Sequence, residues 1–434
     1  MTTRELTRPA DSSGTQAPNR WWIVSLLFLA ALINYVDRGN LSIAAVPLMG
    51  HFNRSPAAMG ILLSAFFWSY ALLQMPAGYL VDRVGIKWSY GIAFLIWSLA
   101  SAAMGLASSF LEMVILRIIL GVAEATVTPA SLAYIQRQFS PREQGLPTGI
   151  FTSGMIVGPA VGALVGSVVI NRFGWQALFI FTGLGSCLWL LPWFRSAPTE
   201  APVNVYTSPA PRAPVSWGQV FRLRPAWAIT IGAFFYSYYW YFCLTWLPSY
   251  LIMSRHFSYL KMGTFTTLPF AVLSVVSPLS GWSADKLIER GGSPLAVRKV
   301  FVCLGFLLGS SICLVPQVKS ANVVLLTLVC SLGGIGLASA NYWALTETIT
   351  PESMIGRVIG YQNTIANLAG VLAPIVTGWL VGKTQNFGLA ILLSAGALWI
   401  AAAAYGFLLW RKDLDLARPY FPEPLHFDHH APKG

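Results

Sequence analysis

Apolar segments of about 20 residues recur along this chain, and they restrict its fold more than any other feature. We count twelve of them, at residues 21–49, 58–80, 88–107, 110–137, 145–169, 175–194, 226–253, 261–284, 299–316, 321–347, 356–382 and 388–410. A helix of about 20 apolar residues spans the hydrocarbon core of a bilayer. Only 10% of the 434 residues are charged, whereas a soluble domain carries about 25%. The sequence therefore predicts an all-α membrane protein with twelve transmembrane helices.

A polar segment rich in Pro, Ala and Ser, residues 195–225, divides these helices into two groups of six. The segment has no apolar periodicity, which is typical of a linker. We expect five regions in total: a cytoplasmic N-terminal segment (1–20), a six-helix bundle (21–194), a cytoplasmic linker (195–225), a second six-helix bundle (226–410) and a cytoplasmic tail (411–434).

A short motif is repeated after the second and the eighth apolar segments, which indicates that the two bundles are related. GYLVDRVGIK occupies residues 78–87 and GWSADKLIERGG occupies residues 281–292. Three positions recur at a constant offset: Gly78, Asp82 and Arg83 correspond to Gly281, Asp285 and Lys286. Two related helical bundles are typical of secondary transporters.

The net charge is +12, and the positively charged residues are placed unevenly between the two sides of the membrane, which predicts the topology. Of the 28 Lys and Arg residues, 20 lie in segments on the side of both termini, six lie in the opposite loops and two lie inside the membrane. The positive-inside rule therefore predicts that both termini are cytoplasmic. The positive charges form no patch with interleaved aromatic residues, so we expect the lipid bilayer and no nucleic acid as a partner. The five cysteines have no metal-ligand spacing, so we expect no metal site.

Four ionisable residues lie inside apolar segments of the first bundle. Asp37 and Arg38 are in the first segment, and Arg117 and Glu124 are in the fourth. Each charge at mid-bilayer costs roughly 2.5–3.5 kcal/mol on insertion scales, so such residues persist where they face a protein interior or a water-filled cavity. An ion-pair network that only fixes helix packing is the simpler interpretation. We favour a binding and proton-relay site.

These residue types suit the transport of an anion with a proton. The guanidinium of arginine binds a carboxylate through two hydrogen bonds and stays charged. A carboxylic acid can carry the coupling proton, because burial and a neighbouring arginine act in opposite directions on its ionisation. Glu124 shares a helical stripe with Arg117, so we favour it as the proton site linked to substrate. Asp37 points about 100° away from Arg38 and is expected to meet another helix.

Uncharged polar residues complete the predicted site. Tyr70 and Gln74 share a face of the second segment, and Asn363 and Asn367 share a face of the eleventh. The seventh segment is unusually aromatic, and Tyr238 or Tyr239 is our candidate there for lining a cavity. Interhelical packing or hydrogen bonding is the alternative role for each of these residues.

GYLVDRVGIK closely resembles the cytoplasmic loop signature of the major facilitator superfamily. INYVDRGNLSIA, LSAFFWSYALLQMPAGYLVDR and RIILGVAEATVTPA are similar to the anion:cation symporter family within it, which includes galactonate, hexuronate, glucarate, phthalate and hydroxyphenylacetate transporters. The resemblance covers essentially the whole chain. It implies proton-coupled uptake of organic carboxylates by alternating access between two six-helix bundles.

Carried over position by position, the resemblance implies specific roles. Asp37 and Glu124 would be the protonatable pair, and Arg38 or Arg117 would hold the substrate carboxylate or set the proton affinity of these acids. Tyr35, Tyr70, Asn363 and Asn367 would line the cavity, and the loop signature would act in conformational change through Gly78, Asp82, Arg83, Gly85 and Asp285. Met155 lies where sugar-acid members carry a glutamine, which favours a less hydroxylated or aromatic carboxylate. The expected substrate is therefore a small organic carboxylate, either a sugar acid or an aromatic or aliphatic acid. The short loop between Met49 and Met59 favours a bacterial inner-membrane protein.

Two further function classes are compatible with a helical membrane protein. Gly154, Gly158, Pro159, Gly162 and Gly166 nearly match a pattern associated with antiporters, so an organic-anion exchanger or exporter is the alternative to a symporter. A membrane enzyme is disfavoured because the chain has no H-E-x-x-H, G-x-S-x-G or phosphate-binding glycine loop. We expect a monomer with a small organic anion and protons as its partners and with no cofactor.

Overall fold

The computed structural model describes residues 19–140, 143–199, 224–350 and 355–409, and their regular secondary structure is helical. Most of the predicted N-terminal segment, linker and tail lies outside these residues. The first half contains α1 (Arg20–His51), α2 (Pro56–Val84), α3 (Ile86–Met104), α4 (Phe110–Glu124), α5 (Val127–Gln138), α6 (Gly145–Ser186), a 3-10 turn (Cys187–Trp189) and α7 (Leu190–Ser196). The second half contains α9 (Arg224–Met253), α10 (Tyr259–Glu289), α11 (Pro294–Gly309), a 3-10 segment (Ser310–Gln317), α12 (Ala321–Ile349), α13 (Ile355–Thr384) and α14 (Gly388–Leu408).

These helices form twelve membrane-crossing segments within the described residues. Eight stretches are long and apolar enough to cross a membrane by length and composition, among them α1, the first part of α2, and α10, α12, α13 and α14. The stretch Gly145–Ser196 is folded back at Gly174, whose φ of 83° is in the left-handed region that favours glycine. This bend separates the predicted fifth and sixth segments.

The predicted segment 110–137 is divided in the structure into α4 and α5. The break lies at Ala125 and Thr126, and Pro129 follows in the first turn of α5. Proline has no N–H to donate to the carbonyl of residue 125, and its ring clashes with that carbonyl in a continuous helix. Glu124 is consequently the last residue of α4, at a discontinuity inside the membrane.

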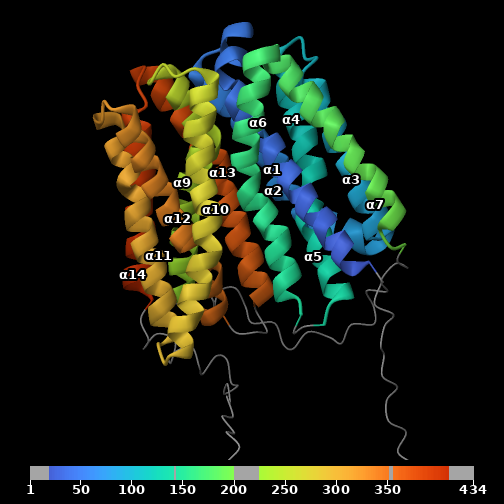
Figure 1. The fold of residues 1–434 in the computed structure, drawn as a ribbon, viewed down its shortest axis with the longest axis vertical. Helices are drawn as coiled ribbons and strands as arrows, with labels where there is room; N and C mark the ends of the chain where they lie inside the picture. The colour runs from blue at the N-terminus through green and yellow to red at the C-terminus, as the bar shows by residue number, and fades with distance from the viewer. Residues whose placement is uncertain (1–18, 141–142, 200–223, 351–354, 410–434) are drawn as a thin grey trace, which may run out of the picture.

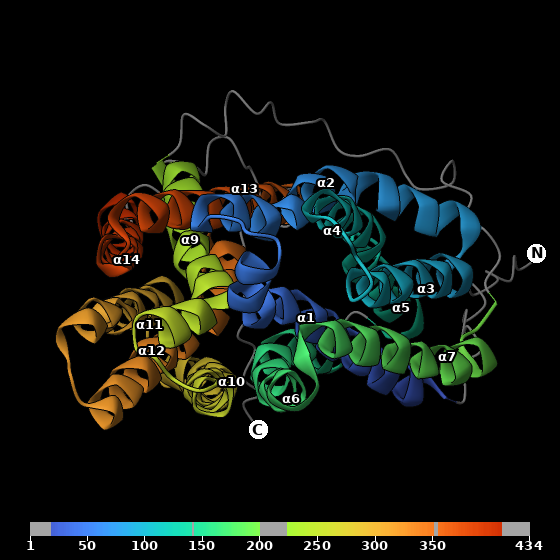
Figure 2. The ribbon, with the colours of Figure 1, turned by 90° about the horizontal axis from the view of Figure 1, so that it is seen from above.

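The helices are arranged in two bundles, one for each half of the chain (Figure 1). In the first bundle α1 packs on α6, α2 packs on α4, and α3 packs on both α4 and α6. In the second, α9 packs on α13 and α14, and α12 packs on α10 and α11. The bundles meet along three helix pairs, α2 with α13, α6 with α10 and α1 with α9 (Figure 2).

Two glycines near the starts of α2 and α10 bring the bundles into close contact on one side of the membrane. We call the side where α1 begins and α14 ends the terminal side, and the other the opposite side (Figure 1). A Cβ at Gly60, near the start of α2, would lie 2.5 Å from the carbonyl oxygen of Pro374 and 3.3 Å from the Cα of Gly378 in α13. A Cβ at Gly263, near the start of α10, would lie 2.4 Å from the Cβ of Ser167 in α6. The bundles are therefore closed against each other on the opposite side.

The repeated motif lies on the terminal side in both bundles. Asp82 accepts a hydrogen bond from Arg137 at 2.8 Å, and Asp285 accepts one from Arg298 at 2.9 Å. Gly85 joins α2 to α3 with a φ of 87°, a backbone conformation that explains the glycine at this position. Each motif thus contains a carboxylate paired with an arginine from another helix of the same bundle.

Candidate functional site

An ion pair between α1 and α4 is the centre of the site. Arg38 Nε donates to Glu124 Oε2 at 2.9 Å, and the two side chains are 5% and 0% exposed. A buried charge without a partner of opposite sign is strongly destabilising, so each of these two side chains needs the other. The two predicted segments are thus joined by their charged residues, inside the first bundle.

Three aromatic rings surround the Arg38 guanidinium. Its Cζ lies 4.8 Å from the ring centroid of Tyr35 and 4.5 Å from those of Phe66 and Tyr70. Phe66 and Tyr70 are stacked one helical turn apart, with centroids 5.0 Å apart. Cation–π contacts of this kind are worth about 2 kcal/mol or more when desolvated. Tyr35 and Tyr70, which the sequence analysis predicted to line the site, thus lie next to the ion pair. Phe66 lies there as well, although the sequence analysis did not assign it to the site.

A glycine allows α4 to approach α2 at this level. A Cβ on Gly121 would lie 2.3 Å from the carbonyl oxygen of Phe66 and 2.4 Å from Ser69 Oγ. The Ser69 hydroxyl donates to the carbonyl oxygen of Ile118 at 2.8 Å. The close approach places Glu124, one turn further along α4, within reach of Arg38.

Asp37 points in a different direction from Arg38, as their adjacency in the helix requires. Its Oδ1 accepts hydrogen bonds from Ser101 Oγ of α3 at 3.1 Å and from Asn40 Nδ2 at 3.3 Å. Asn40 also donates to Thr182 Oγ1 at 2.9 Å, in the second part of α6. Asp37 therefore faces the interior of the first bundle, with neutral partners.

Arg117 is 3% exposed, and its Nε and Nη1 have no hydrogen-bond partner among the described residues. It lies within electrostatic range of Glu124, Arg38 and Asp37, and its Cζ is 5.5 Å from the Phe66 ring. The four charges predicted from sequence therefore form one cluster. A buried guanidinium with unused donors is suited to binding an anion.

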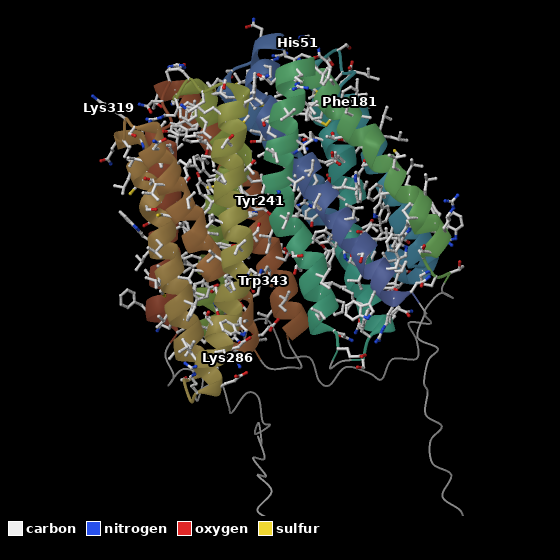
Figure 3. The ribbon with its side chains drawn as sticks, viewed as in Figure 1. His51, Phe181, Tyr241, Lys286, Lys319 and Trp343 are labelled. Atoms are coloured by element: carbon white, nitrogen blue, oxygen red, sulfur yellow. The ribbon has the colours of Figure 1, made fainter. Side chains whose placement is uncertain are left out.

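The second bundle contributes neutral residues. Tyr241 of α9 has its ring 4.5 Å from Phe67, and its hydroxyl donates to Asn367 Oδ1 at 3.5 Å. It lies midway along the molecule between the bundles (Figure 3) and within electrostatic range of Arg38. Tyr236, on the same helix, lies within electrostatic range of Tyr35. The Tyr236 ring stacks on Phe306 and contacts Tyr342 inside the second bundle. Tyr241 is thus the tyrosine of α9 whose ring contacts the first bundle, and the uniformly aromatic sequence gives no signal that selects it.

Tyr238 and Tyr239 are not brought to the ion pair. The Tyr239 hydroxyl is hydrogen-bonded to Ser331 Oγ of α12, inside the second bundle. Tyr238 lines an apolar groove of about 620 Å³ between α9, α13 and α14, together with side chains such as Leu372 and Trp399. Successive helical residues point about 100° apart, so these two tyrosines face different neighbours from Tyr241.

A hydrogen bond links the bundles near the site. Asn363 Nδ2 of α13 donates to Gln74 Oε1 of α2 at 2.7 Å. Gln74 is one helical turn beyond Tyr70, towards the terminal side. Asn363 and Gln74, which were predicted as site residues independently of each other, therefore form a direct contact between the two bundles.

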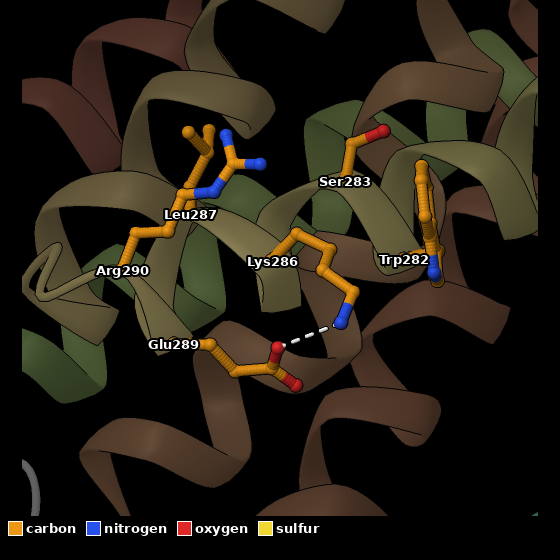
Figure 4. A pocket seen from close by; sticks show the side chains of 6 residues that line it. All are labelled: Trp282, Ser283, Lys286, Leu287, Glu289 and Arg290. Carbon is orange, nitrogen blue, oxygen red and sulfur yellow. Dashed lines mark hydrogen bonds and ion pairs between the residues drawn. The ribbon is translucent and has the colours of Figure 1, made fainter.

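A larger surface hollow, of about 720 Å³, lies at the end of α10, away from this cluster. It is lined by Trp282, Lys286, Glu289 and Arg290, among others, and Lys286 Nζ donates to Glu289 at 2.8 Å (Figure 4). Hydrogen bonding and charge from Glu289 raise the pKa of Lys286. Among the described residues no group of three or more His, Cys, Asp or Glu side chains is arranged to hold a metal ion. The buried cluster of Asp37, Arg38, Arg117 and Glu124 is therefore our candidate for the functional site.

Comparison with known proteins agrees with this architecture. Residues 27–374 match the family model described as Major Facilitator Superfamily. The chain is 30% identical to the D-galactonate transporter of Escherichia coli O6:H1 (strain CFT073) over 89% of this chain and 94% of that protein. It is 30% identical to the hexuronate transporter of Bacillus subtilis (strain 168) over 88% and 93%.

A solved structure shows the same fold. A bacterial homolog of the human lysosomal transporter Spinster, in an inward-facing and occupied conformation, superimposes with a TM-score of 0.76 at 19% identity, covering 91% of this chain and 98% of that one. The predicted fold class of two six-helix bundles is confirmed. The chain belongs to the major facilitator superfamily, in its anion:cation symporter family of membrane transporters, and is not an enzyme.

Proposed function

We propose that this protein is a secondary transporter that takes up a small organic carboxylate together with a proton. The observation that carries the proposal is the buried Arg38–Glu124 ion pair, next to Arg117 and surrounded by aromatic rings. Relatives that are named as galactonate and hexuronate transporters support a carboxylate as the substrate.

Charge balance gives the physical reason for coupling. Two acids, Asp37 and Glu124, and two arginines, Arg38 and Arg117, sum to zero when all are ionised. A carboxylate that enters this low-dielectric cluster alone adds an uncompensated charge, which is costly. A proton that enters with it restores neutrality. If Glu124 takes the proton, the ion pair is released and Arg38 becomes available to the substrate carboxylate.

The topology relates the closed side of the molecule to a side of the membrane. The distribution of Lys and Arg supports a cytoplasmic location for both termini in a bacterial inner membrane. The contacts at Gly60 and Gly263 then close the external side of the described conformation.

Exchange is the second candidate mechanism. Its sequence evidence is the glycine pattern of the fifth segment, and helix packing explains that pattern as well. A Cβ on Gly154 would lie 2.4 Å from the Phe28 carbonyl oxygen, and one on Gly158 would lie 2.5 Å from the Tyr35 Cβ. These glycines let α6 pack closely on α1 in the first bundle. Their presence therefore gives exchange no independent support.

The experiment uses purified protein in proteoliposomes and radiolabelled D-galactonate. An inside-alkaline pH gradient is expected to drive accumulation in the unmodified protein and to fail in Glu124→Gln, because the amide cannot carry a proton. Substrate counterflow, measured in the same variant, establishes that it is folded and binds. Glu347→Gln is the matched control, since Glu347 is exposed at the end of α12.

Two outcomes would contradict the proposal. Gradient-driven accumulation that persists in Glu124→Gln would exclude Glu124 as the coupling residue. Exchange in the unmodified protein that is indifferent to the pH gradient would favour the exchanger.

A further inference from the structure

All charged side chains within the membrane-crossing part belong to the first bundle. The sequence contains no Asp, Glu, Lys or Arg in residues 225–254, 262–284, 300–318, 320–346, 358–382 or 384–410. The two cations available to an anionic substrate are therefore Arg38 and Arg117. Both lie over the same Phe66 ring, with Cζ-to-centroid distances of 4.5 and 5.5 Å, so they are held close together.

The facing side of the site is neutral. Tyr241 of α9 and Asn363 and Asn367 of α13 contribute hydroxyl, amide and aromatic groups there. Asn367 is 2% exposed, and its Nδ2 has no hydrogen-bond partner among the described residues. A buried amide with an unused donor is satisfied when an acceptor oxygen of a ligand, such as a hydroxyl or carbonyl oxygen, binds it.

From this asymmetry we infer that the substrate is a monocarboxylate: its one carboxylate binds the arginines of the first bundle, and its uncharged remainder binds the second bundle. The inference rests on the proposed function and specifies its substrate class. A diacid of the same length would present its second carboxylate to Tyr241 and Asn367, where no cation compensates it. An ionised carboxylate buried without a partner is strongly disfavoured.

Two matched pairs of acids test this inference in proteoliposomes. Galactonate and galactarate share a polyol chain and differ at one terminal carbon, and benzoate and phthalate share an aromatic ring. Competition with the labelled acid that is taken up best measures each affinity. The monoacid is expected to bind at least about tenfold more tightly than its diacid in the pair that the protein recognises.

A cation placed in the second bundle provides the converse test. Asn363 is half-buried and contacts Gln74 at the junction of the bundles, so Asn363→Lys introduces an ammonium group facing the first bundle. We expect this variant to reduce or reverse the preference for the monoacid. Asn363→Gln, which keeps the amide, is the matched control and should retain the preference. Size-exclusion profiles of both variants establish that they are folded.

The outcomes separate the inference from the proposed function. Tighter binding of the diacid by the unmodified protein, or an unchanged preference in a folded Asn363→Lys variant, overturns the inference and leaves carboxylate transport intact. A lack of gradient-driven uptake for all four acids overturns the proposed function, and the inference falls with it.

Discussion

Arg38 illustrates how far a single residue can be interpreted from sequence. An arginine inside an apolar segment must find a partner, so its burial and its pairing with an acid follow from the cost of an unpaired charge. The identity of that acid does not follow. Asp37 is adjacent in sequence but accepts hydrogen bonds from Ser101 and Asn40, whereas the distant Glu124 forms the ion pair. The choice depends on how α1 is rotated against α3 and α4, which the sequence pattern does not specify.

Replacement of Arg38 by lysine tests whether the shape of the guanidinium matters as well as its charge. Lysine keeps the charge but has no planar fork to bind a carboxylate and to stack between Tyr35, Phe66 and Tyr70. Loss of a charge-assisted hydrogen bond is worth about 1.5–3 kcal/mol. We therefore expect Arg38→Lys to raise the KM for the transported carboxylate by about 10- to 100-fold. Arg54→Lys, at an exposed position on the opposite side, is the control. An unchanged KM in Arg38→Lys would show that charge alone suffices.

At the level of helices, the sequence predicted existence and length well and predicted breaks and rotations poorly. The segment predicted at 321–347 is a helix at Ala321–Ile349, and the one predicted at 388–410 ends at Leu408. Length follows from hydropathy, because an apolar run must match the bilayer thickness. The interruption after Glu124 depends on local proline geometry, and the orientation of the tyrosines in α9 depends on which neighbouring helices pack against it. The uniformly aromatic sequence of α9 does not indicate which neighbouring helix each tyrosine contacts.

The approach of α4 to α2 predicts a stability effect at Gly121. The Cβ of Gly121→Ala would overlap the Phe66 backbone, which cannot move as a side chain can. Overpacking of this kind costs about 1–3 kcal/mol. We expect a lower melting temperature in detergent and weaker transport, because the helices that carry Arg38, Phe66 and Glu124 are forced apart. Gly149→Ala in α6 is the control, because nothing lies within 4 Å of a Cβ at that position. Equal melting temperatures for the two variants would contradict the assigned packing.

For the whole molecule, the relation between the two bundles determines access to the site. In the described conformation α2 and α13 meet at the opposite side through Gly60, Pro374 and Gly378. Small residues allow this close contact without large interlocking side chains, so the contact can form and separate repeatedly. Transport by alternating access requires that it separate once in each cycle, to admit substrate from that side.

A disulfide across this contact is therefore expected to stop transport. A Cβ built on Gly382 of α13 lies 3.8 Å from the Cβ of Ala57 in α2, which is about the mean separation in native disulfides. In a background without the five native cysteines, Ala57→Cys with Gly382→Cys should cross-link under mild oxidation and lose uptake, and a reducing agent should restore it. Each single cysteine variant, treated in the same way, should keep its activity. Uptake at the normal rate by protein shown to be fully cross-linked would mean that α2 and α13 stay together throughout the cycle, and access to the Arg38–Glu124 pair would then have to open along another pair of helices.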